Sequence, residues 1–91
     1  MQIIYYLGEL ISKRIGISQS ASRGLLKLSI KDEFGPYESI ESLRLTHYQK
    51  VIQNSLKKRF IDLKVENFEN LVNLLLDELM KHQSLLTMEK I

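Results

Sequence analysis

The sequence predicts an all-α fold, a small bundle of about four amphipathic helices in one domain covering residues 1–91. Apolar residues recur at spacings of three and four along most of the chain. Leu and Ile supply 26 of the 40 apolar residues and Val only three, which favours helix packing over a β-sheet. There is no cysteine, so a disulfide framework and a Cys-based zinc site are excluded. A chain this short has a thin core, which dimerisation would complete.

The first helix is expected over residues 2–15. Its apolar residues fall on one helical face, and Gly16 is well placed to end it. The residues of that face are Ile3, Ile4, Leu7, Leu10, Ile11 and Ile15.

The second helix is expected over residues 19–34, with Ser18 or Ser20 as its N-cap. A stripe of Ala21, Leu25 and Leu28 marks its inner face. From residue 26 to residue 31 apolar and polar side chains also alternate, so a strand over residues 24–31 is the competing interpretation. We favour the helix because helix-permissive Lys, Asp and Glu residues continue to the Gly35–Pro36 pair, which ends it.

The third and fourth helices are expected over residues 47–63 and 68–84, with a tail at residues 85–91. Thr46 followed by Gln49 matches a capping box, and Asn67 is a suitable N-cap. The stripe of the third helix is Tyr48, Ile52, Leu56, Phe60 and Leu63. The inner face of the fourth is Phe68, Leu71, Val72, Leu75, Leu76 and Leu79.

Helix four carries more apolar surface than one bundle core requires. Such a surplus commonly docks on a second copy or on a partner helix. We therefore expect a homodimer or a protein partner contact through helix four and the tail. The alternative is that the connection at residues 35–45 covers the surplus. The expected interface residues are Leu74, Leu75, Leu79, Met80 and Leu86.

Charge alternates strongly along the chain. Residues 1–31 have a net charge of +4, residues 32–42 of −4, residues 43–64 of +5 and residues 65–91 of −3. One interpretation is complementary faces within a single bundle. The other is a basic surface that meets nucleic acid or an acidic partner.

Residues 11–26, Ile-Ser-Lys-Arg-Ile-Gly-Ile-Ser-Gln-Ser-Ala-Ser-Arg-Gly-Leu-Leu, resemble a bacterial or archaeal helix-turn-helix. The family has an apolar core residue at the position of Ser22 in this chain. If the family pattern is aligned one residue earlier, Ala21 takes that core position instead. The resemblance implies a recognition helix whose Gln19, Ser20 and Arg23 face the major groove. The DNA-binding residues it implies are Lys13, Arg14, Gln19, Ser20, Arg23 and Lys27.

Other functions find little support. No phosphate-binding loop, nucleophile elbow or dinucleotide fingerprint is present, so we expect no enzyme and no cofactor. Glu78 and His82 share one helical face but are too few for a metal site. We expect no membrane segment and a cytoplasmic location. The leading hypothesis is a non-catalytic protein–protein interaction or regulatory module that self-associates; the alternative is a helix-turn-helix transcriptional regulator.

Overall fold

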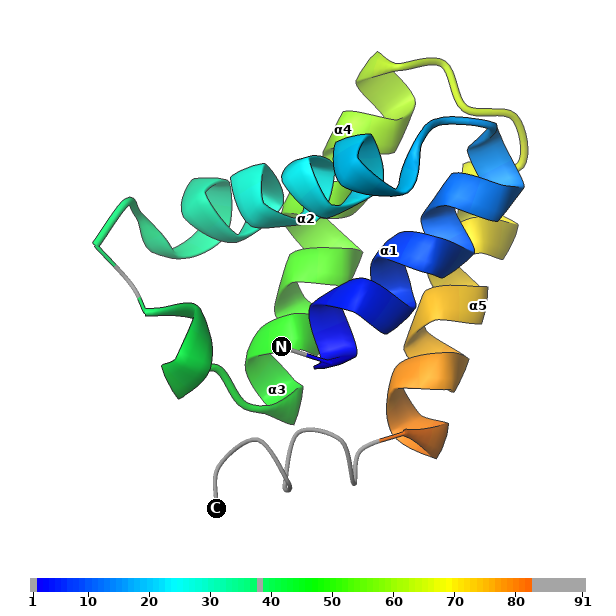
Figure 1. Cartoon of the computed structure of the whole chain (residues 1–91). Coiled ribbons are helices and arrows are strands. Elements are labelled where there is room, and N and C mark those ends of the chain that lie inside the picture. Colours follow the sequence, from blue (N-terminus) through cyan, green and yellow to red (C-terminus); the bar gives the residue numbers. More distant parts are fainter. Residues whose placement is uncertain (1, 38, 83–91) are drawn as a thin grey trace.

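A computed structural model describes residues 2–37 and 39–82, and its helices confirm the predicted all-α bundle. The chain folds as helix α1 (Gln2–Ile15), helix α2 (Gln19–Phe34), the 3₁₀ turn η1 (Ile40–Ser42) and three joined segments, followed by helix α5 (Phe68–Lys81) (Figure 1). The joined segments are α3 (Leu45–Val51), the π-helical η2 (Ile52–Leu56) and α4 (Lys57–Asp62). They form one continuous rod that corresponds to the predicted third helix.

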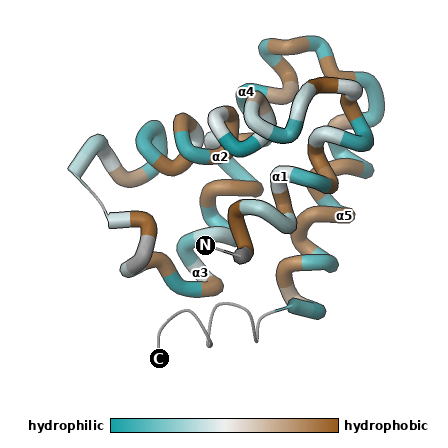
Figure 2. Tube along the Cα trace, in the orientation of Figure 1, coloured by the Kyte–Doolittle hydropathy of each residue, from teal (hydrophilic) through white to brown (hydrophobic). Residues whose placement is uncertain are grey.

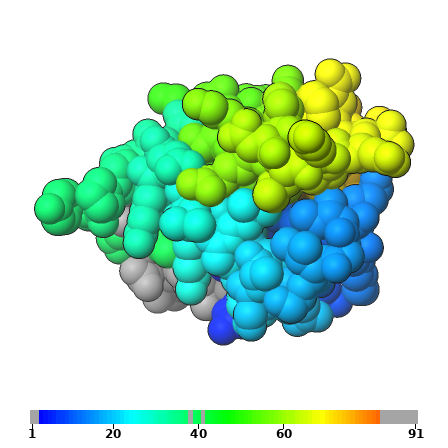
Figure 3. All heavy atoms as spheres, turned by 90° about the horizontal axis from the view of Figure 1, so that it is seen from above, coloured from blue at the N-terminus to red at the C-terminus, as the bar shows by residue number. Residues whose placement is uncertain are grey.

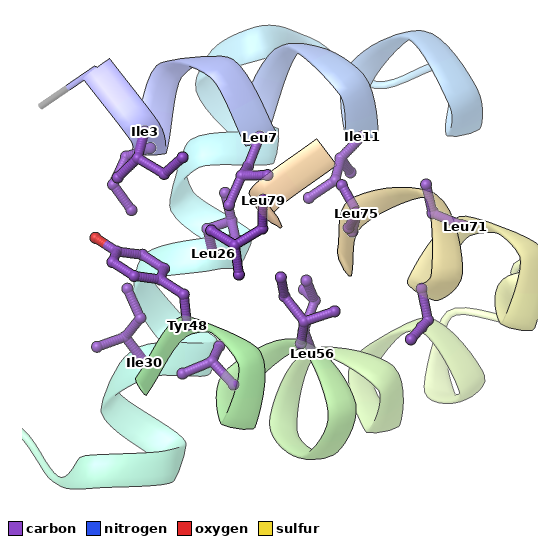
Figure 4. Packing of buried hydrophobic residues seen from close by; sticks show 14 of the residues in the cluster. Ile3, Leu7, Ile11, Leu26, Ile30, Tyr48, Leu56, Leu71, Leu75 and Leu79 are labelled. Carbon is purple, nitrogen blue, oxygen red and sulfur yellow. The ribbon is translucent and has the colours of Figure 1, made fainter. Parts of the chain in front are cut away.

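The core lies where α1, α2, the α3–α4 rod and α5 meet (Figure 4). Hydrophobic residues recur between hydrophilic ones along each helix, as in amphipathic helices (Figure 2). Every helix contributes fully buried aliphatic or aromatic side chains. The largest of them are Tyr48, Phe60, Ile3, Ile4, Leu7, Ile11, Leu26, Ile30, Leu43, Ile52, Leu56 and Leu71.

The π-helical segment keeps the rod's apolar residues in line. Four of them, Tyr48, Ile52, Leu56 and Phe60, follow one another at intervals of four residues, and all are buried. In an α-helix of 3.6 residues per turn, a spacing of four drifts by about 40° at each step. A π-helical turn, with its i→i+5 bonds, holds more residues and absorbs this drift. Leu63, the next member of the predicted stripe, falls outside the core.

Several predicted boundaries need correction. The rod begins at Leu45 rather than at 47, because the backbone N–H of Arg44 donates to His47 Nδ1 (2.8 Å) and no Thr46 cap is formed. It ends at Asp62 rather than 63. Helix α5 ends at Lys81, short of 84, and the predicted tail lies outside the described residues. Asn67 precedes α5 as expected, although its side chain makes no cap bond.

The inner face of α2 also differs from the predicted stripe. Ala21 is exposed and Leu28 is 47% exposed, whereas Ser22, Leu26, Ser29 and Ile30 are buried. The buried face of α2 thus includes two serines, whose small side chains suit close packing against the neighbouring helices. The spacing of apolar residues alone does not reveal a buried face that contains serines. The helix itself is confirmed over residues 24–31, where a strand was the alternative.

Candidate nucleic-acid interface

The turn between α1 and α2 has the geometry of a tight helix-turn-helix connection. Gly16 adopts a left-handed backbone conformation (φ 75°), and its N–H donates to the carbonyl oxygen of Ser12 (2.9 Å). The Ser12 hydroxyl in turn donates to the carbonyl oxygen of Ile17 (2.6 Å). A residue with a Cβ would be strained at this φ. Gly16 and Ser12 together therefore fix the direction in which α2 leaves the turn.

The first turn of α2 is capped and open to solvent. The Ser18 hydroxyl accepts a hydrogen bond from the backbone N–H of Ala21 (3.0 Å). Gln19 and Ser20 are exposed, as the helix-turn-helix resemblance implies. Ser22 is fully buried while Ala21 is exposed, so the register that places position 22 in the core is the one adopted.

Helices α1 and α2 approach each other closely at Gly8. A Cβ atom on Gly8 would lie 2.9 Å from Cγ of Arg23, so this position accommodates the arginine side chain. The Arg23 guanidinium lies over the ring of Tyr5, 4.5 Å from its centroid, and donates to the Ser20 hydroxyl (3.3 Å). Arg23 is thus held against the surface by α1 and by its own helix.

The remaining basic residues of this region are exposed. Lys13 forms an ion pair with Glu9 (3.2 Å), one turn earlier in α1. Arg14, Lys27 and Lys31 form no ion pair within the described part of the chain. Residues 10–31 hold no acidic residue. We call this surface the basic face; it comprises Lys13, Arg14, Gln19, Ser20, Arg23, Lys27 and Lys31.

Acidic residues next to the basic face are engaged by the α3–α4 rod. Arg59 donates from Nε to Asp32 Oδ2 at 2.7 Å, and its Nη2 lies 2.7 Å from the same oxygen. The Ser55 hydroxyl donates to Glu33 (2.8 Å). The charge alternation of the sequence therefore serves partly to join α2 to the rod. It also engages the two carboxylates that follow Lys31, whereas Glu66 lies near Arg14 at the other end of the basic face.

Lys31 was missed by the sequence analysis, because the family resemblance ends before it. The spacing of the basic residues could have indicated it, since Arg23, Lys27 and Lys31 follow one another at intervals of four residues along α2. Such a spacing places side chains on neighbouring turns of one helical side. From above, α2 lies between α1 and α4 and its outer face is uncovered (Figure 3).

The contact surface expected on α5 is largely not present. Leu75 and Leu79, expected at an interface, are fully buried in the domain's own core and present no surface to a partner. Leu74 is partly buried and packs against the core, and only Met80, 46% exposed, faces outward. Leu86 lies outside the described residues. The apolar surplus is used internally, because α5 packs against α1 on one side and the α3–α4 rod on the other (Figure 4).

A polar cluster joins α1 to the end of α5. Tyr6 donates to Glu78 Oε2 (2.8 Å), and the same oxygen lies 3.4 Å from His82 Nε2. The rings of Tyr6 and His82 are 4.4 Å apart. Burial, followed by the hydrogen bond to the Glu78 carboxylate, raises the pKa of Tyr6 above its ordinary value. Ionisation of Tyr6 would place a second negative charge beside Glu78.

This raised pKa predicts a loss of stability in alkaline solution. The unfolded chain releases the Tyr6 proton near pH 10, whereas the folded chain retains it to higher pH. The contribution of Tyr6 is therefore complete below about pH 10 and falls as the pH rises above it. Below this pH the wild type should unfold at a higher urea concentration than Tyr6→Phe, and the difference between the two midpoints should shrink as the pH rises above it. Tyr37→Phe, at a 98% exposed position, should follow the wild type throughout. Parallel curves for wild type and Tyr6→Phe would contradict the assignment.

Within the part of the chain that the structure describes, no three potential metal ligands gather, and no helix is both long and apolar enough to cross a bilayer. No protein-family model, curated protein or solved structure matches this chain.

Proposed function

We propose that this chain binds duplex DNA non-catalytically through the basic face, as a helix-turn-helix regulator. The observation that carries the proposal is the left-handed Gly16 turn, which sets α2 on the surface with Arg23, Lys27 and Lys31 along one side. Duplex DNA is a dense line of phosphate charge, and basic side chains that neutralise it supply most of non-specific affinity.

The residues of the basic face divide into two roles. Lys27, Lys31 and Arg14 carry exposed charges suited to phosphate contacts, which position a protein on the duplex. Gln19 and Ser20 stand in the first turn of α2, where recognition helices meet base edges. The N-terminal end of α2 adds the positive end of the helix dipole at the same place.

The interaction module expected from the sequence is the weaker proposal. It depended on an apolar surface on α5, and Leu75 and Leu79 are part of the core. The exposed side of α5 is instead mostly polar: Glu69, Asn70, Asn73, Asp77 and Lys81. Self-association through α5 is therefore poorly supported. Of the residues expected on the basic face, Arg14, Gln19, Ser20 and Lys27 are exposed, while Lys13 is paired with Glu9 and Arg23 is half-buried against Tyr5.

Fluorescence anisotropy with a mixed-sequence duplex tests the proposal. At about 50 mM salt we expect a Kd in the micromolar range. At about 200 mM salt the Kd should be at least about tenfold higher, because the release of counterions from the DNA is less favourable at the higher salt concentration. No binding at the lower salt, or a Kd that does not change with salt, would contradict DNA binding.

Variants locate the contact. The double variant Lys27→Ala/Lys31→Ala should weaken binding and reduce the salt slope by about two, because each lysine neutralises about one phosphate. Lys81→Ala removes a charge from α5, on the other side of α1 from α2 (Figure 1), and should bind as the wild type does. Equal weakening per charge removed in the two proteins would indicate attraction by net charge alone and not by the basic face.

A further inference from the structure

The α1–α2 turn and the α4–α5 loop, two distant parts of the sequence, meet at one end of the molecule (Figure 1). A hollow lies between them. Its volume is about 380 Å³, which admits one or two bulky side chains. The four aliphatic side chains of its wall are Ile15, Ile17, Leu63 and Val65. The basic face shares Arg14 with this hollow and otherwise extends away from it along α2.

Leu63 is the member of this wall that the domain does not bury. It is 58% exposed, although its spacing continues the apolar stripe of the rod. Leu63 follows the last residue of α4, where the chain turns away from the core. Its side chain thus remains available to a partner.

The loop that carries Leu63 is held in a fixed shape. The N–H of Leu63 donates to Arg59 (2.9 Å), that of Lys64 to Ile61 (3.0 Å), and that of Val65 to Phe60 (3.0 Å), each to a carbonyl oxygen. Lys64 adopts a left-handed conformation (φ 58°), which is uncommon for a residue with a side chain. A site formed in advance costs a ligand less ordering than one that must assemble on binding.

The rim of the hollow is more positive than negative. Arg14 and Lys64 line it and form no ion pair within the described residues, while Glu66 is the one carboxylate in the lining. All three are exposed. The site therefore has no buried polar group to orient a small polar molecule, but it has an apolar wall beside unpaired cations.

We propose that this hollow binds a short segment of a protein partner, in which a bulky apolar side chain enters between Ile17 and Leu63 and flanking carboxylates meet Arg14 and Lys64. The apolar side chain covers the exposed surface of Leu63, and the carboxylates complement the charge of the rim. The turn of the helix-turn-helix forms one side of the site, which shares Arg14 with the basic face, but the site does not require that α2 bind DNA.

A library of random short peptides displayed on phage is the probe, selected against the full chain. Enriched peptides should combine an apolar residue with neighbouring acidic ones. A fluorescent copy of such a peptide should bind Leu63→Ser about tenfold more weakly than the wild type. Lys64→Asn, which tolerates the left-handed conformation, should bind it more weakly and with less dependence on salt.

Ile61→Ser is the matched control, because Ile61 is 48% exposed and does not line the hollow. It should bind the peptide as the wild type does, and both serine variants should keep the wild-type circular dichroism. The proposal is overturned if no peptide is enriched, if the enriched peptides are basic, or if Leu63→Ser and Ile61→Ser bind equally. It is also overturned if Leu63→Ser impairs duplex binding and leaves peptide binding intact, since the hollow would then belong to the nucleic-acid surface. A loss of peptide binding with normal duplex binding supports it.

Discussion

Replacement of Leu75 by Asp is expected to unfold the domain. Leu75 has no exposed surface and lies in the middle of α5, among side chains from several helices (Figure 4). Truncation of such a leucine to alanine alone costs about 2–5 kcal/mol, and a carboxylate adds the cost of an unpaired buried charge. Small domains have about 5–15 kcal/mol in total. We expect Leu75→Asp to lack the helical circular dichroism and the cooperative thermal transition of the wild type.

Met80→Asp is the matched control on the same helix. Met80 is 46% exposed, so an aspartate there remains in water and should change the unfolding free energy by less than about 1 kcal/mol. Size-exclusion chromatography separates this outcome from the dimer that the sequence suggested. If Leu75→Asp stayed helical and merely passed from dimer to monomer, Leu75 would belong to an interface between copies and not to the core of one domain.

Helices α1 and α5 could be located from the sequence because their apolar residues are distributed as in ordinary amphipathic helices, whereas α2 was located by its N-cap serine and the Gly35–Pro36 pair that ends it. In α1, for example, Ile3, Leu7 and Ile11 are buried as the spacing predicts. The rod could be predicted too, although a periodicity analysis that assumes 3.6 residues per turn does not reveal its π-helical segment. Intervals of four residues from Tyr48 to Phe60 are the signal that was available.

The surface of α5 could not be predicted, because the amount of apolar surface that a helix buries depends on how many neighbours it has. A helix with one neighbour needs a narrow stripe, whereas α5 packs against both α1 and the α3–α4 rod. Leu74 and Leu76 therefore reach the core from its flanks and leave little for a partner. Leu63 shows the opposite case: its spacing predicts burial, but the chain turns before the stripe can continue.

The basic face was more accessible to sequence reasoning, since all its residues except Lys31 lie in or next to the segment that resembles a helix-turn-helix. What the sequence left open was the register, and Ser22 decides it. Its hydroxyl is buried and has no hydrogen-bond partner within the described residues, and it occupies the position where the helix-turn-helix pattern places an apolar side chain. A buried hydroxyl without a partner reduces stability by about 1–3 kcal/mol relative to one that is satisfied.

Ser22→Ala is accordingly expected to stabilise the domain, by about 1 kcal/mol, since it removes the unsatisfied hydroxyl and keeps the small volume. Ser22→Leu, which restores the apolar residue of the pattern, should instead destabilise it by about 1–3 kcal/mol. The reason is the close approach of α1 and α2, where Gly8 already lies against Arg23 and little space is left for a larger side chain. Urea unfolding of the three proteins measures both effects.

The neighbouring Ala21→Leu is the control for this comparison, because Ala21 is exposed and a leucine there enters water. It should leave the unfolding free energy within about 0.5 kcal/mol of the wild type. The opposite result, in which Ser22→Leu stabilises the protein and Ala21→Leu does not, would mean that α1 and α2 leave room for a leucine between them. In that case Ser22 would be a defect in a conventional helix-turn-helix core. If Ala21→Leu were the destabilising change, α2 would have to be rotated by one residue, and the side chains of the basic face would point elsewhere.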